Sequence, residues 1–293
     1  MSAHADDIAK GERFAFGENW ARFLEHLDED RIRLAEDSLR HMLRVDSLAG
    51  KSFLDIGSGS GLFSLVARRL GARVRSFDYD PQSVACTLEL KRRYFPEDPS
   101  WDIHAGNALD GDFIASLGRF DVVYSWGVLH HTGNMWLALA NAVTPVAPGG
   151  QLFIAIYNDQ GWRSKVWRLL KKAHCRNVLG RWAVTALGSA YFGFVCLKED
   201  LVRLRNPLRR YRDYKNANRG MSILYDWIDW FGGYPFEVAS PTELVDFHTD
   251  KGFVLTRLRT VGGALGCNEF VFRLEGSPST TYLYSSSVSA SQP

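Results

Sequence analysis

The sequence predicts an α/β protein built on a doubly wound, mostly parallel sheet. Strand-like apolar segments alternate with helix-like segments over residues 52–157. Parallel strands joined through helices use right-handed crossovers, which cover both faces of the sheet. The predicted strands are Ser52–Ile56, Arg73–Phe77, Trp101–His104, Phe120–Ser125 and Gln151–Tyr157. The predicted helices are Leu62–Leu70, Ser83–Tyr94 and Asn134–Val143.

The flanking regions predict helices before the sheet and a hairpin that closes it. Apolar residues at helical spacing in 19–45 indicate one or two amphipathic helices over an edge or mouth of the sheet. A turn is expected at Pro148–Gly150. A helix at Thr242–Lys251 precedes strands Phe253–Arg259 and Asn268–Leu274, joined by a glycine-containing loop. The divisions are N-terminal helices (1–50), the alternating region (51–159), a helical insertion (160–240), a last helix with the hairpin (241–275) and a disordered serine-rich tail (276–293).

Composition favours a soluble, cytoplasmic protein without a metal. Hydrophobic residues make up 46% and charged residues 23%, with a net charge of +2, which indicates a folded globular chain. The four cysteines are far apart, so neither disulfides nor a zinc site is expected. The N-terminus is acidic and polar, unlike a secretory signal. The longest apolar stretch, Ala183–Leu197, is shorter than the about 20 residues that a bilayer span needs.

A glycine-rich segment follows the first predicted strand. Its sequence, LDIGSGSG, places glycines at 57, 59 and 61, which let the chain turn tightly and a ligand approach the backbone. In the dinucleotide motif G-x-G-x-x-G the third glycine would stand where Leu62 is. Asp55 would repel a pyrophosphate but attract the ammonium group of an amino acid. The spacing therefore favours S-adenosylmethionine over a dinucleotide.

Two acidic residues follow the second predicted strand. Asp78 stands at the strand end, where a carboxylate can accept hydrogen bonds from both ribose hydroxyls. Asp80 competes for that role, but its position before Pro81 favours a helix N-cap. Tyr79 lies between them and could contact the adenine.

Five motifs in order resemble those of class I S-adenosylmethionine-dependent methyltransferases. They are LDIGSGSG, SFDYDPQS, GNALD, FDVVYSWGVLHHTG and APGGQLFIAIYN, within about residues 51–158. Within the family, VLHHTG and FGENW most resemble the small-molecule branch that includes ubiquinone-type methyltransferases. The resemblance implies a seven-stranded sheet whose last strand is antiparallel, with S-adenosylmethionine across the ends of the first two strands and S-adenosylhomocysteine as the product.

The resemblance also implies roles for individual residues. Asp55 and the first two glycines would line the methionine part, and Asp78 the ribose. Asn107, where the family often has Asp, would contact adenine together with Ala108, and Ser125 with Trp126 would lie behind the sulfonium. The predicted cofactor-binding set is Asp55, Gly57, Ser58, Gly59, Gly61, Asp78, Tyr79, Asn107, Ala108, Ser125 and Trp126.

Methylation of a hydroxyl or ammonium group also requires removal of a proton. His130 and His131 follow the fourth strand at the ligand-bearing edge, and either could be the base. Packing against the cofactor loop or capping the next helix is the alternative. Tyr157, Asn158 and Asp159 leave the fifth strand and could contact the acceptor, although Asp159 also suits a turn. The catalytic candidates are His130, His131 and Tyr157.

The segment from Gln160 to Lys215 is strongly basic, with 14 Lys and Arg against three acids. Helices are expected around 162–170 and 182–197. The segment could be a lid whose arginines bind a phosphate or carboxylate on the acceptor, a surface on anionic membrane, or an RNA footprint. The aromatic segment Tyr225–Phe236 suits core packing or a wall of the acceptor site.

The sequence as a whole indicates a methyltransferase that acts on a small or lipid-linked, anionic acceptor. The expected partner is a small molecule that bears a phosphate or carboxylate, and nucleic acid is disfavoured. The expected location is the cytoplasm, with peripheral contact at the inner face of the membrane as a further possibility. A tRNA methyltransferase and a non-catalytic S-adenosylmethionine-binding protein are the alternatives.

Overall fold

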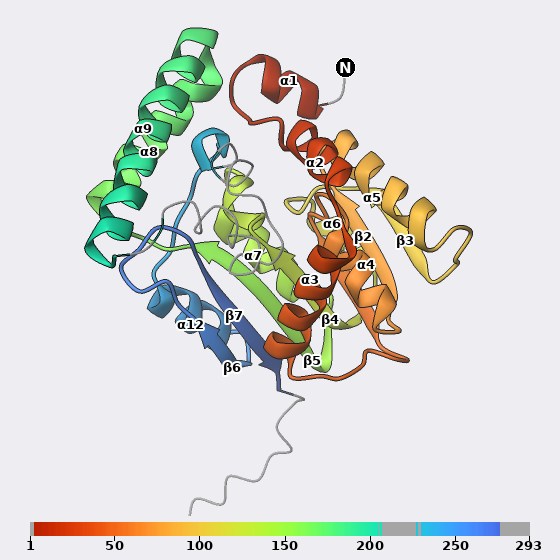
Figure 1. Cartoon of the computed structure of the whole chain (residues 1–293). Helices are drawn as coiled ribbons and strands as arrows, with labels where there is room; N and C mark the ends of the chain where they lie inside the picture. Colours follow the sequence, from red (N-terminus) through yellow and green to blue (C-terminus); the bar gives the residue numbers. More distant parts are fainter. Residues whose placement is uncertain (1–2, 205, 207–226, 228–229, 276–293) are drawn as a thin grey trace, which may run out of the picture.

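The computed structural model describes residues 3–204, 206, 227 and 230–275, and its centre is a seven-stranded sheet (Figure 1). The strand order is β3-β2-β1-β4-β5-β7-β6. Strands β1 to β5 are parallel, whereas β7 runs antiparallel to both β5 and β6. The predicted fold and its closing hairpin are therefore confirmed. The strands are β1 (Ser52–Ile56), β2 (Arg73–Asp78), β3 (Trp101–Ala105), β4 (Phe120–Trp126), β5 (Val146–Tyr157), β6 (Phe253–Arg259) and β7 (Cys267–Leu274).

Helices cover both faces of the sheet, because the central strands present apolar side chains to both sides. One core cluster joins α3, α4 and α5 to one face, and the second joins α6, α7 and α12 to the other. The helices are α1 (Ala3–Ala9), α2 (Phe16–Glu25), α3 (Glu29–Leu43), α4 (Leu62–Arg69), α5 (Pro81–Tyr94), α6 (Gly111–Ser116), α7 (Met135–Val143), α8 (Trp162–Arg176), α9 (Val178–Val202) and α12 (Pro241–Thr249), with a 3-10 turn, η1, at Leu129–His131.

Helix starts follow local capping chemistry. The Asp80 carboxylate accepts from the Gln82 N–H at 2.9 Å, with Pro81 at the first helical position of α5. The prediction that Asp80 caps this helix is thus confirmed. At α12, Ser240 and Glu243 form a reciprocal capping box.

The turn predicted at Pro148–Gly150 is wrong, since these residues lie inside β5. The pairing of β4 with β5 jumps from Phe120↔Val146 to Val122↔Gln151, so the extra residues bulge out of the ladder. A bulge absorbs such residues without ending the strand.

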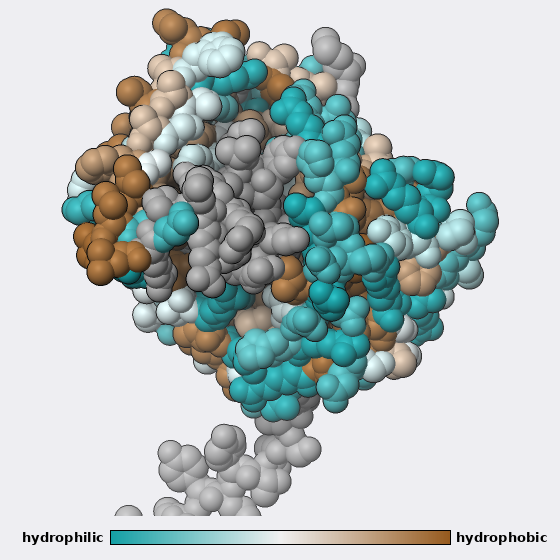
Figure 2. Space-filling model, viewed as in Figure 1, coloured by the Kyte–Doolittle hydropathy of each residue, from teal (hydrophilic) through white to brown (hydrophobic). Residues whose placement is uncertain are grey.

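Helices α8 and α9 pack side by side at one end of the molecule, away from α4 and α5 (Figure 1). Helix α9 has 25 residues, so it extends past both ends of the predicted 182–197 helix. By length and composition alone, α9 is long and apolar enough to cross a membrane. Hydrophobic residues gather on the surface over this pair (Figure 2). The predicted disordered tail lies outside the described residues, as do residues 225, 226, 228 and 229 of the aromatic segment.

Candidate functional site

A cavity of about 600 Å³ lies at the carboxyl ends of β1, β2 and β4. This is the edge at which open α/β sheets bind their ligands. Segments far apart in the sequence form its wall: the N-terminal segment, the loops after the first, second and fourth strands, helix α9 and the closing hairpin. Of the predicted site residues, those that line it are Asp55, Gly57, Ser58, Gly59, Asp78, Tyr79, Asn107, Ala108, Trp126, His131 and Tyr157.

The glycine loop adopts a conformation that L side chains rarely reach. Gly57 and Gly59 have φ of +78° and +56°. A Cβ on Gly57 would lie 2.3 Å from Val128 Cγ1, and one on Gly59 would lie 3.0 Å from the Trp20 indole nitrogen. The loop therefore requires glycine for backbone conformation and for close packing against neighbouring segments.

Asp55 is buried at the end of β1, beneath the glycine loop. Its carboxylate accepts a 2.5 Å hydrogen bond from Ser64 Oγ, and Ser64 contacts Ser76 Oγ at 2.7 Å. Burial raises the pKa of Asp55 to about 7, against the opposing effect of the Ser64 hydrogen bond. A cationic group entering the cavity would favour the ionised carboxylate.

Asp78 is held at the end of β2 by backbone donors. Its two oxygens accept from the N–H groups of Gly59 and Asp80, both at 2.9 Å. Burial raises the pKa of Asp78 to about 6. The carboxylate therefore joins the glycine loop to the end of the second strand and faces the cavity.

The wall beyond Asp78 consists of Tyr79, Asn107 and Ala108. The Asn107 side-chain oxygen accepts from the Leu109 N–H at 2.9 Å, which orients the amide. The Arg13 guanidinium lies 5.0 Å from the centre of the Tyr79 ring. This wall therefore combines an aromatic ring with one oriented amide, groups that can contact a purine ring.

Three residues of the predicted cofactor-binding and catalytic sets do not line the cavity, and neither do Asn158 and Asp159, the other predicted acceptor contacts. Gly61 is the left-handed N-cap of α4, and a Cβ there would lie 2.9 Å from the Thr87 backbone. The fully buried Ser125 hydroxyl donates to the Ile56 carbonyl at 2.9 Å, which links β4 to β1. His130 is also fully buried, with its ring centre 4.0 Å from that of Tyr157. Gly61, Ser125 and His130 therefore pack behind the residues that line the cavity.

His131 and Tyr157 do reach the cavity, and their rings meet edge to face at 5.4 Å. His131 Nδ1 lies 2.6 Å from the Pro235 carbonyl, which can only accept, so Nδ1 carries the proton and Nε2 is the acceptor. Burial lowers the pKa of His131 to about 3 and that of His130 well below its usual value. Both imidazoles are therefore neutral near pH 7, and His131 is a hydrogen-bond acceptor rather than a strong base.

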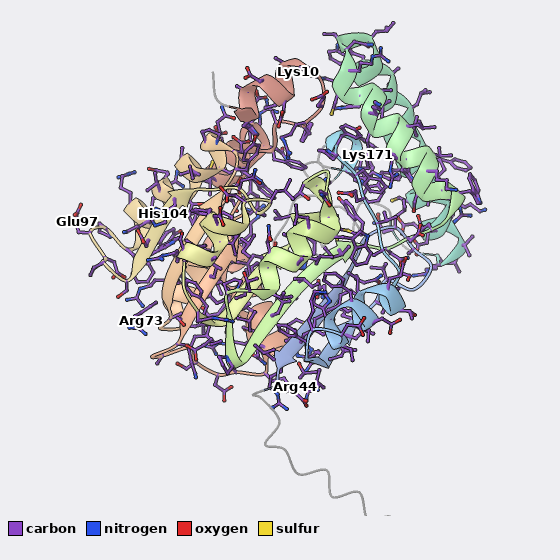
Figure 3. The ribbon with its side chains drawn as sticks, turned by 180° about the vertical axis from the view of Figure 1, so that it is seen from behind. Lys10, Arg44, Arg73, Glu97, His104 and Lys171 are labelled. Carbon is purple, nitrogen blue, oxygen red and sulfur yellow. The ribbon has the colours of Figure 1, made fainter. Side chains whose placement is uncertain are left out.

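A buried lysine that the sequence did not single out lies behind these rings. Lys171 projects from α8 toward the body of the domain (Figure 3) and donates to the Trp230 carbonyl. Its ammonium is 4.3 Å from the Trp230 ring centre and 4.7 Å from that of Phe236. This cation–aromatic cluster connects the insertion to the end of β5.

The sequence predicted N-terminal helices over the mouth of the sheet, but it did not identify the individual wall residues that come from the chain ends. Arg13, Phe16 and Trp20 line the cavity from the N-terminal segment, and Phe16 and Trp20 belong to the FGENW motif. From the closing hairpin come Arg259 and the buried Glu269. Glu269 Oε1 accepts from the Trp126 indole at 3.1 Å, while Oε2 lies 3.6 Å from Arg259 and has no hydrogen-bond donor among the described residues.

Within its described residues, the insertion contributes apolar rather than basic side chains to the cavity. Helix α9 provides Phe192, Val195 and Cys196. The described arginines that line the cavity, Arg13 and Arg259, lie outside the insertion. Four arginines of the basic segment, at 205, 209, 210 and 212, lie outside the described residues. Among the residues that the structure describes, no group of His, Cys, Asp or Glu could hold a metal ion.

Residues 27–191 match the family model described as a methyltransferase domain. The chain belongs to this methyltransferase family. The prediction of a class I, S-adenosylmethionine-dependent methyltransferase is confirmed at the level of family and fold. The roles given to individual residues stay predictions.

Curated relatives of this methyltransferase act on different acceptors. It is 28% identical over 168 residues to a ubiquinone biosynthesis O-methyltransferase from Methylobacterium sp. (strain 4-46), covering 54% of this chain and 65% of the relative. It is 35% identical over 114 residues to a tRNA U34 carboxymethyltransferase from Pseudomonas savastanoi pv. phaseolicola, covering 38% of this chain and 28% of the relative. The chain thus spans less than two thirds of either relative.

Solved structures with the same fold include magnesium protoporphyrin IX methyltransferase from Synechocystis PCC 6803 with bound S-adenosylhomocysteine. The TM-score is 0.50 at 14% identity, covering 87% of this chain and 93% of that one. A putative methyltransferase from Haloferax volcanii, in complex with the Trm112 activator, has a TM-score of 0.51 at 13% identity. The match covers 89% of this chain and 96% of that one. At this identity the likeness concerns the fold.

Proposed function

We propose that the chain transfers a methyl group from S-adenosylmethionine to a small or lipid-linked acceptor that carries an anionic group. The proposal rests on one observation: two chemically different parts of the wall line the same cavity. One part has the glycine loop and the carboxylates of Asp55 and Asp78, with Arg13 over Tyr79, and the other has aromatic rings with Arg259. The relation to a ubiquinone biosynthesis O-methyltransferase supports a small-molecule acceptor.

The chemistry of the first part fits the cofactor. Asp55 offers a carboxylate to the cofactor's ammonium, and Asp78 offers acceptors to the ribose hydroxyls. Tyr79 and Asn107 supply a ring and an oriented amide for adenine. When bound, S-adenosylmethionine supplies an electrophilic methyl group, which an acceptor attacks in line with the departing sulfur.

The residues of the other part position the acceptor and exclude water. Phe16, Trp126 and Tyr157 make an apolar wall, so an aligned acceptor would meet the methyl group in a dry site. Neutral His131 can accept a hydrogen bond from an acceptor hydroxyl through Nε2. Buried Glu269 Oε2 has no hydrogen-bond donor in the part of the chain that the structure describes, so an acceptor hydroxyl could donate to it at this wall.

The first test is calorimetric titration of the protein with S-adenosylhomocysteine, with NADH as the control. Saturable binding of S-adenosylhomocysteine alone is the expected result. Binding of neither ligand to folded protein would contradict the cofactor assignment. Transfer of labelled methyl to 3,4-dihydroxybenzoate and a prenylated analogue then tests the acceptor class.

A tRNA methyltransferase is the second candidate, because a tRNA-modifying relative is 35% identical and the insertion is basic. Retention of tRNA that weakens with salt, together with methyl transfer to it, would favour this candidate. Tight S-adenosylhomocysteine binding without transfer to any acceptor would favour a non-catalytic binding protein.

A further inference from the structure

Helix α9 has its large apolar side chains on the outside. The residues that face the domain are mainly small or polar: Gly180, Val184, Thr185, Gly188, Ser189, Phe192, Gly193, Cys196, Glu199 and Asp200. The opposite stripe, here called the apolar face, consists of Val178, Leu179, Trp182, Leu187, Tyr191, Phe194, Val195, Leu197, Leu201 and Val202. A surface helix in water normally shows the reverse pattern.

The exposure of the apolar face is large. Leu179 is 80% exposed, Leu187 73%, Trp182 70% and Phe194 67%. Four exposed apolar residues of α8 extend it: Trp162, Val166, Leu169 and Leu170. Figure 2 shows hydrophobic residues along this edge of the molecule. A continuous patch of this kind marks a surface that is covered by a partner.

Basic side chains flank the apolar face. Residues 160–198 contain eight Lys or Arg and no Asp or Glu. Those exposed on the two helices are Arg163, Lys165, Arg168, Lys172, Arg176, Arg181 and Lys198. A second copy of the same face would bring like charges together, whereas an anionic surface complements them. Exposed Trp and Leu with a basic border are typical of helices that lie in a membrane interface.

We propose that the α8–α9 pair lies on an anionic lipid bilayer, with the apolar face in the headgroup and acyl boundary and the basic side chains among the phosphates. The helix does not cross the bilayer, because its inner stripe stays on the domain. Phe192 and Cys196 line the cavity, and Asp200 is buried to 3% exposure. The membrane contact is therefore peripheral.

Membrane contact would also place the cavity beside the lipid. Val195 is 41% exposed and lines the cavity, so one helix separates the proposed acceptor site from the bilayer. This consequence rests on the proposed function: an acceptor with a lipid chain could keep that chain in the membrane while its head enters the cavity. The membrane contact itself does not depend on catalysis.

The experiment is vesicle flotation of the full chain. Vesicles of phosphatidylcholine with phosphatidylglycerol should carry the protein upward, and vesicles of phosphatidylcholine alone should carry much less. Binding to the anionic vesicles should fall as salt is raised, because electrostatic attraction at a surface is screened. Calorimetry with S-adenosylhomocysteine on the same sample reports the cofactor site separately from membrane binding.

Two kinds of variant test the two parts of the surface. The double variant Leu179→Glu with Leu187→Glu should reduce the fraction floated by at least about tenfold, since it puts charges where apolar area would be buried. The pair Arg176→Glu and Arg181→Glu keeps the apolar face and should lose the preference for anionic vesicles. The controls are Leu88→Glu on α5 and Arg73→Glu, an exposed residue far from the helical pair (Figure 3). Both should float like the unaltered chain.

Several outcomes would overturn the proposal. Failure of the folded chain to float with anionic vesicles would do so, as would flotation unchanged in both kinds of variant. A dimer that Leu187→Glu dissociates, without vesicle binding, would make the apolar face a self-association surface. Salt-sensitive tRNA retention without vesicle binding would assign the basic residues to RNA. If the leucine variant fails to fold, the arginine pair and the salt series still decide the result.

Discussion

Asp78 accepts a hydrogen bond from the backbone N–H of Gly59 at 2.9 Å, so the acid after β2 holds the glycine loop after β1. Two features of the sequence that lie 19 residues apart are thus one structural unit. The carboxylate that is expected to bind ribose also holds the glycine loop in its conformation. A substitution at Gly59 or at Asp78 should therefore alter both the glycine loop and the end of β2.

Asp78→Ala should weaken S-adenosylhomocysteine binding by about 1.5–3 kcal/mol, because charge-assisted hydrogen bonds to the ribose are lost. Calorimetry at constant pH measures the change. The exposed acid Asp112 supplies the control, and Asp112→Ala should bind like the unaltered chain. Undiminished affinity in Asp78→Ala would remove the ribose assignment.

Gly57→Ala should destabilise the fold more than Gly149→Ala does. Both glycines have positive φ, +78° and +75°, so both alanine variants carry a cost of about 1–2 kcal/mol for the left-handed backbone. Only the Cβ at 57 meets a neighbour, Val128 Cγ1 at 2.3 Å, whereas nothing lies within 4 Å of one at 149. Urea unfolding measures the difference. Equal losses would show that the loop accommodates a Cβ.

Asp55→Asn should stabilise the ligand-free protein above pH 7. Burial raises the pKa of Asp55 from 3.8 to about 7, so between these values the folded state binds more protons than the unfolded state. The free energy of unfolding therefore falls as pH rises through this window, and the full cost remains above it. Asparagine removes the charge and can still accept a hydrogen bond from Ser64. The free energy of unfolding should therefore rise by about 1–4 kcal/mol near pH 8.

Urea unfolding of the variant and the unaltered chain near pH 5 and pH 8 measures this gain, which should be larger at the higher pH. The same variant should bind S-adenosylhomocysteine more weakly, because the carboxylate opposite the ammonium is lost. A variant that is less stable at both pH values would show that the ionised carboxylate stabilises the fold. Stability and binding are expected to change in opposite directions.

Arg13→Ala should speed the release of S-adenosylhomocysteine. Arg13 lies over Tyr79 and donates to the His131 carbonyl at 3.0 Å, so it ties the N-terminal segment across the cavity. Loss of this tie should raise the dissociation rate by about tenfold, as expected for an interaction of about 1.4 kcal/mol. Stopped-flow fluorescence can follow release because Trp20 lines the cavity. The control is Arg33→Ala, which changes an exposed residue on α3. Equal dissociation rates in both variants would show that Arg13 does not hold the N-terminal segment over the ligand.

Local patterns were enough to predict most elements and one end of the site. The LDIGSGSG segment, Asp78 and the Asp80–Pro81 cap depend on residues a few positions apart, so the sequence specifies them directly. The bulge at Pro148–Gly150 was missed because the register of β4 against β5 decides whether a Pro-Gly-Gly segment turns or bulges. The short helix α6 was missed as well, since six residues leave little periodicity.

The sequence determined the family, the sheet and the cofactor loop, because these arise from contiguous motifs whose spacing and backbone needs are local. Tertiary structure determined which side chains share the cavity: Arg13 meets His131 across 118 positions, and Glu269 meets Trp126 across 143. It also determined protonation, since burial makes His131 a neutral acceptor. The apolar stripe of α9 became a candidate membrane surface only when packing turned its small and polar residues inward.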